Sequence, residues 1–183
     1  IIYLLKFLEF SEKYFPQRLN SFLKKNDFVY ANVPYVIKDY KSIYKDPKNT
    51  IDFNFDLAEK IESDREKEGA DGAILKNYQG LKHQVNFFEK ILTTILAKLS
   101  NFIPDAGIWM NTQRPEWNDA NNALVGNGVS MVTLYYLNRF FNFFEELLES
   151  STTQEVEVSN EILQFFDKVL DTFEKNKGLL SSS

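Results

Sequence analysis

The sequence predicts an all-α fold made of helical hairpins joined by long loops. Two observations support this prediction. Long stretches of the 183-residue chain carry apolar residues at the 3.6-residue spacing of an amphipathic helix. The β-like runs are short, and isolated pairing of such runs is marginal. The helical pairs are joined by loops of very unequal length, and no repeated sequence period is present.

The N-terminal third contains one helix and an irregular connection. Ile1–Lys25 follows the helical period, which Pro16 should interrupt or restart. Asn26–Thr50 loses this period and is predicted to be extended or looping. Phe28–Val33 and Ile51–Phe55 are the two β-like runs, and they are candidates for pairing with each other.

The middle of the chain contains two further predicted helices. Asp56–Lys67 is charge-rich with a narrow apolar side, which is typical of an exposed helix. Glu68–Gly80 is rich in turn residues, and its Asp71 and Asn77 are candidates for lining a sugar pocket. His83–Phe102 has strong helical spacing, and we expect it to end at Pro104 and Gly107, which open a long loop.

Two helices are predicted after that loop. Val129–Glu149 is apolar nearly all round in its first half, so we expect it to be buried on more than one side. Ser159 is predicted to be the N-cap of a last amphipathic helix, Glu161–Lys175. Ser181–Ser183 is predicted to be a fraying tail.

Composition limits the partners and the compartment. The net charge of −5, without a basic stripe, argues against nucleic acid as a partner. The apolar run Ile1–Leu5 is far too short to span a membrane. The absence of Cys fits a cytoplasmic protein, but the chain lacks an initiator Met, so a periplasmic or secreted location stays open. His83 is the only His, so it is predicted to be a capping or packing residue, and no metal site is expected.

Aromatic residues make up 15% of the chain, with 17 Phe, 9 Tyr and 2 Trp. We expect most of the Phe side chains to form the core at helical spacing, because large aromatic rings bury extensive apolar surface. A few exposed rings would then be free to stack on sugar faces.

The candidate site lies in the loop Asp105–Gly126. Amide and carboxylate groups bind sugar hydroxyls by hydrogen bonds, and indole faces suit the apolar face of a pyranose. A carboxyl group beside an indole in a partly dry site has a raised proton affinity, which a general acid needs. The loop carries Trp109, Gln113, Arg114, Glu116, Trp117, Asn118, Asp119, Asn121 and Asn122.

The run Trp117-Asn118-Asp119-x-x-Asn122, followed by Gly126, resembles the Trp-Asn-Asp-x-x-Asn loop of the cellobiose phosphorylase group and related α/α-toroid glycosidases. The resemblance implies that Asp119 is the general acid. It implies that Trp117 and Asn118 shape the loop or contact sugar, and that Asn122 forms hydrogen bonds within the loop or to the substrate.

It also implies an (α/α)6 toroid, which needs about twice this length. Residues 1–183 are therefore expected to be a single helical domain, a fragment of a larger catalytic toroid domain whose remainder lies in the parent polypeptide.

The second catalytic group stays open at this point. An inverting hydrolase needs a base carboxylate roughly 6.5–9.5 Å from the acid, and Glu116 is a candidate. In a phosphorylase, inorganic phosphate is the co-substrate and nucleophile, and Arg114 would help to bind it. The base can equally lie outside this chain. No other cofactor is expected.

The predicted function is therefore cleavage of a glycosidic bond in an oligosaccharide, by a hydrolase or a phosphorylase. The alternative is a noncatalytic helical module that binds carbohydrate or another protein. For Asp119 itself, the alternative is a helix N-cap or turn carboxylate.

Overall fold

A computed structural model describes residues 1–110, 127–153 and 155–180 of the chain. The predicted all-α fold is wrong. The described residues are 57% helical and 13% strand, with seven α-helices and three small antiparallel sheets. The arrangement is mixed α and β, so it is not part of an all-α toroid. Short strands lie in several segments that were predicted to be helix or loop, among them Tyr35–Ile37, Gln84–Val85 and Gly107–Trp109.

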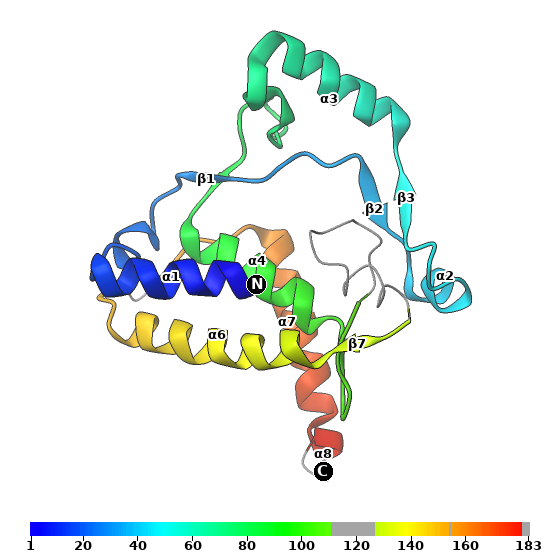
Figure 1. The fold of residues 1–183 in the computed structure, drawn as a ribbon. Coiled ribbons are helices and arrows are strands. Elements are labelled where there is room, and N and C mark those ends of the chain that lie inside the picture. The colour runs from blue at the N-terminus through cyan, green and yellow to red at the C-terminus, as the bar shows by residue number, and fades with distance from the viewer. Residues whose placement is uncertain (111–126, 154, 181–183) are drawn as a thin grey trace. The chain divides into compact units, whose positions relative to one another are not determined.

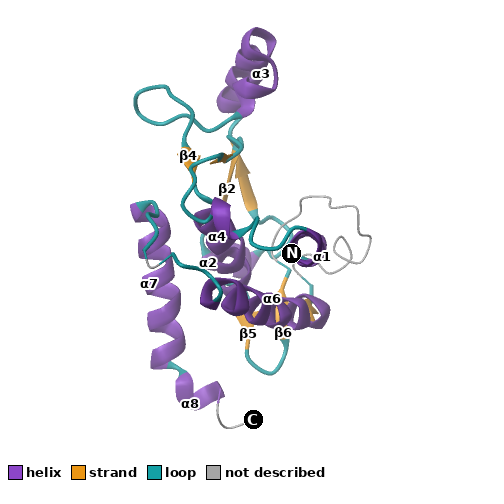
Figure 2. Ribbon diagram, turned by 90° about the vertical axis from the view of Figure 1, so that its left-hand side faces the viewer, coloured by secondary structure: helices purple, strands orange, loops and turns teal. Residues whose placement is uncertain are grey.

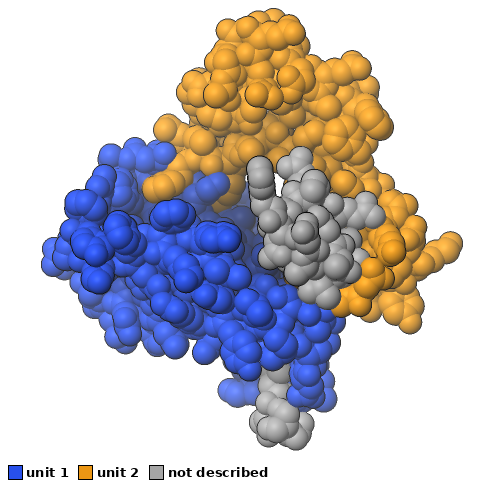
Figure 3. Space-filling model, viewed as in Figure 1, with its two compact units in different colours: residues 1–27, 85–109, 129–183 blue, residues 28–84, 110–128 orange. Residues whose placement is uncertain are grey.

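The chain divides into two compact units (Figure 3). Unit 1 contains residues 1–27, 85–109 and 129–180. Unit 2 contains residues 28–84 together with residues 110, 127 and 128. Each unit is described separately below.

Unit 1 is mainly helical, and α1 and α6 run side by side in it (Figure 1). Its helices form because apolar residues recur on one side of each, so that the side packs inward. The elements of unit 1 are α1 (Ile2–Tyr14), the 3-10 helix η1 (Asn20–Phe22), α4 (Phe87–Leu99), β5 (Phe102–Ile103), β6 (Gly107–Trp109), β7 (Val129–Ser130), α6 (Met131–Glu149), α7 (Asn160–Lys175) and α8 (Lys177–Leu180).

The core of unit 1 is made by aliphatic side chains and a few Phe rings. α1 buries Leu5 and Leu8, while α6 buries Phe140 among other residues. At the edge of this contact, the Arg139 guanidinium donates two hydrogen bonds to the Glu9 carboxylate, at 2.6 and 2.7 Å. This bidentate geometry orients α6 on α1 more than it stabilises the pair, because both side chains are partly exposed.

Buried polar groups tie α4 to the segment that leads into α7. The Asn86 side chain caps α4 by accepting from the Glu89 N–H at 2.9 Å, and it donates to the Glu157 carbonyl at 2.6 Å. The Glu89 carboxyl group accepts from the Ser159 N–H at 2.7 Å and from the Ser159 hydroxyl at 2.8 Å. Only 2% of the Glu89 residue is exposed, so these bonds replace water that the carboxyl group has lost.

Unit 2 combines two helices with short strands. Its elements are β1 (Phe28–Val29), β2 (Tyr35–Ile37), α2 (Tyr40–Lys45), β3 (Ile51–Phe53), α3 (Phe55–Glu68), the 3-10 helix η2 (Gly69–Ala73) and β4 (Gln84–Val85), of which Val85 belongs to unit 1.

The strand pairing differs from the prediction. β3 pairs with β2, in the register Tyr35 to Phe53 and Ile37 to Ile51, and β1 pairs with β4. The runs Phe28–Val33 and Ile51–Phe55 therefore do not pair with each other. β2 and β3 are separated only by the short α2 and its flanking loops, so a local partner forms at a lower entropy cost.

Most of the predicted helices are present, with shifted ends. The predictions of helices at 56–67 and 161–175 are confirmed by α3 and α7. α4 begins at Phe87 instead of His83, because the Asn86 side chain caps it there. Ser159 is the N-cap residue of α7, but its hydroxyl is bonded to Glu89 and not to the helix.

The predicted burial of the first half of Val129–Glu149 is wrong. Val132 and Tyr135 on α6 are exposed, and the buried residues of the helix begin at Leu137. The expectation that Phe side chains mostly fill the core is also only partly met, because Phe7 and Phe10 on α1 are exposed. In the described ranges, no helix is long and apolar enough to cross a membrane.

Replacing Glu89 by Gln should lower the free energy of unfolding by about 2 kcal/mol, because the hydrogen bonds from the Ser159 N–H and to its hydroxyl are then made by a neutral amide and are weaker than bonds to a carboxylate. Urea denaturation followed by circular dichroism measures this loss. The control is Glu146→Gln on the exposed face of α6, which should leave stability nearly unchanged. Equal stability of the two variants would contradict a structural role for Glu89.

Candidate functional site

The predicted site residues fall almost entirely in one segment. Trp109 is described, as the last residue of β6. The others lie in residues 111–126, outside the described residues: Gln113, Arg114, Glu116, Trp117, Asn118, Asp119, Asn121 and Asn122. The structure therefore describes the frame from which this segment starts and to which it returns.

The two ends of that segment are held next to each other. β6 pairs antiparallel with β7, with Ile108 opposite Ser130 and Trp109 opposite Val129. One residue further along, the Met110 N–H donates to the Gly128 carbonyl at 3.2 Å. On the other side of β6, the Trp109 N–H donates to the Asn101 carbonyl at 2.8 Å. The predicted site thus begins and ends at a small three-stranded sheet.

Local sequence explains why the chain folds back at β6. Asp105 adopts a positive φ of 58° in the turn between β5 and β6, which Asp tolerates better than most residues. Gly107 has a φ of 135°, which strongly favours glycine, and a Cβ there would lie 3.1 Å from the Ser130 carbonyl oxygen. Ile108 then anchors the strand, because only 1% of it is exposed. The predicted long loop from Pro104 onward therefore starts with an ordered hairpin.

β7 leads directly into α6. The Ser130 hydroxyl caps this helix by accepting from the Thr133 N–H at 3.1 Å. The return end of the segment is therefore attached to a 19-residue helix whose later turns are buried in unit 1. Trp109 is half-buried at the other end, so its ring is a candidate for both packing and ligand contact.

A polar cavity of about 650 Å³ in unit 2 is the alternative location for acid–base chemistry. Asp39 lies at this cavity, where hydrogen bonds from the Ser42 hydroxyl and the Ser42 N–H lower the pKa of its carboxyl group. A general acid requires a raised pKa, so Asp39 is suited to capping α2 and not to proton donation. The described residues that line this cavity include no aromatic side chain. Among the described residues, no cluster of three His, Asp or Glu side chains is placed to hold a metal ion.

The other residues that the sequence singled out have structural partners inside unit 2. The Asp71 carboxylate lies 2.6 Å from the Lys82 ammonium. The Asn77 side chain accepts from the Gln79 N–H at 2.9 Å and from the Leu81 N–H at 3.0 Å, which builds a turn. The His83 ring stacks on Tyr30 with centroids 6.1 Å apart, which agrees with the predicted packing role.

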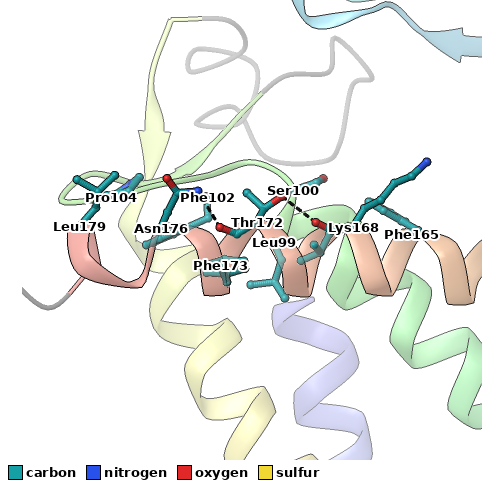
Figure 4. A pocket seen from close by; sticks show the side chains of 11 residues that line it. Leu99, Ser100, Phe102, Pro104, Phe165, Lys168, Thr172, Phe173, Asn176 and Leu179 are labelled. Atoms are coloured by element: carbon teal, nitrogen blue, oxygen red, sulfur yellow. Dashed lines mark hydrogen bonds between the residues drawn. The ribbon is translucent and has the colours of Figure 1, made fainter.

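Sequence reasoning missed an apolar groove in unit 1. The groove holds about 490 Å³ between the end of α4, β5 and the α7–α8 region (Figure 4). Apolar side chains line most of it, and they are Leu99, Phe102, Pro104, Phe165, Val169, Phe173 and Leu179. Among the described residues that line it, the only charged one is Lys168, whose ammonium points away from the groove in Figure 4.

The groove suits an apolar group better than a sugar. Sugar sites need several polar groups aimed at the hydroxyls, and here the Thr172 hydroxyl is already bonded to the Lys168 carbonyl at 2.7 Å. The Asn176 amide donates in the same way to the Thr172 carbonyl at 2.8 Å. Trp109, the predicted site residue that the structure describes, is not among the residues that line the groove. The signal that could have found it was the wide apolar side of Glu161–Lys175.

Replacing Gly107 by Ala should weaken the frame of the predicted site. The new methyl group would approach the Ser130 carbonyl in a backbone conformation that L-residues rarely adopt, at a cost of about 1 to 3 kcal/mol. Thermal unfolding measures the loss, and hydrogen exchange at Met110 should rise. The matched control is Gly178→Ala, where the added Cβ meets nothing within 4 Å. Equal behaviour of the two variants would mean that the β6–β7 contact is not tight.

Comparison of the chain with models of known protein families finds no match. Comparison with curated proteins likewise finds no match. Any functional conclusion therefore depends on the residues themselves.

Proposed function

We propose that this chain carries the acid–base loop of an enzyme that cleaves a glycosidic bond in an oligosaccharide, with Asp119 as the general acid. The observation that carries the proposal is the run Trp117-Asn118-Asp119-x-x-Asn122 within a connector rich in amides, carboxylates and indoles. The proposal depends on this run and on its chemistry. It does not depend on a toroid fold.

The frame of the connector supports the proposal. Catalytic loops work when a rigid scaffold fixes their ends. The paired strands β6 and β7 supply such a scaffold, because the Met110 N–H bonds to the Gly128 carbonyl and the Ser130 hydroxyl caps α6. Trp109 stands half-buried at the start of the connector, within the same strand pair.

The proposed reaction begins with proton transfer from the Asp119 carboxyl group to the glycosidic oxygen. The bond between this oxygen and the anomeric carbon breaks, and the leaving sugar departs as an alcohol. In hydrolysis, water adds to the anomeric carbon and gives its proton to a base carboxylate, for which Glu116 is the candidate. In phosphorolysis, a phosphate oxygen adds instead, and Arg114 would hold the phosphate.

The remaining residues of the motif bind the sugar in this proposal. Asn118 and Asn122 hydrogen-bond to hydroxyl groups, while the Trp117 indole stacks on the apolar face of the ring. Gln113 and Asn121 would add further polar contacts.

A noncatalytic interaction module is the second candidate. It is favoured by α7, which buries none of its side chains although one side of it is strongly apolar. Such a helix is typical of a surface that contacts another protein. Absence of turnover in the unmodified protein would favour this candidate, whereas turnover that is lost when Asp119 is replaced would favour the enzyme.

Replacing Asp119 by Asn should reduce kcat on a disaccharide by about 10²- to 10⁴-fold, because the amide cannot donate a proton to a poor leaving group. An aryl glycoside with a good leaving group should lose much less. Steady-state assays of the full polypeptide that contains these residues measure both effects. The control is Asp105→Asn in the turn between β5 and β6, where Asn also tolerates the positive φ. Near-normal turnover of the disaccharide by Asp119→Asn would remove this residue from the mechanism.

Product analysis should identify the nucleophile. Free reducing sugar formed without phosphate would identify a hydrolase, and Glu116→Gln should then abolish turnover. A sugar phosphate formed only after inorganic phosphate is added would identify a phosphorylase, and Arg114→Ala should then raise the KM for phosphate. Absence of both products across a panel of oligosaccharides would contradict the enzymatic proposal.

A further inference from the structure

Two apolar stripes on unit 1 are exposed although each lies on a well-formed helix. The α1 stripe consists of Tyr3, Phe7, Phe10 and Tyr14, which are 55–78% exposed. These residues are three or four apart, so they form one continuous line on the helix. The opposite side of α1 carries Leu5 and Leu8, which are buried. The aromatic side is therefore not the side with which α1 joins its own core.

The α7 stripe consists of Leu163, Phe166 and Leu170, which are 38–48% exposed. It has the same spacing of three and four residues. The lining of the apolar groove uses other residues of α7, among them Phe165 and Val169. The α7 stripe is thus a separate surface, which α4 leaves uncovered.

The charges beside the two stripes are opposite and have the same spacing. Helical geometry places Lys6 and Lys13 along one edge of the α1 stripe, seven residues or about two turns apart. It places Asp167 and Glu174 along one edge of the α7 stripe, also seven residues apart. All four side chains belong to exposed residues. None of them forms an ion pair with another described residue.

We propose that the chain associates with a second copy of itself, with the α1 stripe of one copy packed on the α7 stripe of the next. Lys6 and Lys13 then face Asp167 and Glu174 across the contact. Within one copy, α1 packs on α6 and α7 packs on α4, and α1 and α7 lie on opposite sides of unit 1 (Figure 2). A single copy therefore cannot bring its own two stripes together, but successive copies can.

This contact is heterologous, because two different surfaces of the same chain meet. The copy at each end of the assembly keeps one stripe uncovered, which can bind a further copy. Assembly therefore continues until a ring closes, or it proceeds as an open chain. The stripes are small, which puts the contact at the low end of specific interfaces. Assembly should therefore depend on concentration. The proposal is independent of glycosidic-bond cleavage.

Sedimentation velocity of the 183-residue chain tests it at between about 5 and 200 µM, the range in which a small interface becomes populated. The unmodified chain should shift from monomer to larger species as concentration rises. Lys6→Glu with Lys13→Glu should weaken association at least about tenfold, because acidic residues then face acidic residues. Asp167→Lys with Glu174→Lys should do the same, with basic residues on both sides.

Mixing the two charge variants should restore association, because every α1–α7 contact between unlike copies is again complementary. All four changes in one chain should restore it as well. The matched control is Lys60→Glu with Lys67→Glu, a seven-residue pair of exposed lysines on α3, which should leave assembly unchanged. Circular dichroism verifies that each variant is folded.

Three outcomes would overturn the proposal. The first is a chain that stays monomeric over the whole range. The second is association that neither charge variant weakens. The third is weakening by the α1 variant alone, because an α1–α1 contact would not respond to Asp167→Lys with Glu174→Lys.

Discussion

The buried carboxyl group of Glu89 is the interaction on which the arrangement of unit 1 depends. It accepts both the N–H and the hydroxyl of Ser159, and so it fixes the start of α7 against the start of α4. Apolar packing adds to this attachment, because Phe165, Val169 and Phe173 of α7 are half-buried, although α7 has no fully buried side chain. Asn86 adds a second bond from the same turn of α4. Removal of an acceptor here leaves buried donors without partners, which costs more than the bond itself contributes.

This mode of attachment explains why so much apolar surface remains available on α7. A helix held by polar bonds at its N-terminus does not need to press its whole apolar side into the core. One part of that side faces α4, another lines the groove near Phe173, and a third forms the exposed α7 stripe. The sheet of β5, β6 and β7 is organised separately, by Gly107 and Ile108, so the frame of the predicted site does not depend on α7.

Sequence periodicity predicted the longer helices and missed α2, and the two β-like runs contain β1 and β3 while the other strands were missed, for physical reasons. α3 and α7 follow from their spacing alone. The strands are only two or three residues long, too short for an alternating pattern, and their pairing depends on where helices and turns bring the chain. The start of α4 at Phe87 was readable from Asn86 as an N-cap. The exposure of Tyr135 on α6 could not be predicted in this way. Periodicity shows that one side of a helix is apolar, and it does not show whether another element covers that side.

For the candidate site too, the sequence indicated the chemistry of the residues and not their geometry. Residue types suggested a connector that binds sugar, and the resemblance of the Trp117–Asn122 run implied that Asp119 is the acid. The resemblance also implied a toroid, and the strands on either side of the connector contradict that part. A loop motif needs only that its two ends be held at a fixed separation. The β6–β7 pair meets this need by itself, so the loss of the toroid removes one argument for the acid at Asp119 and leaves the chemical one intact.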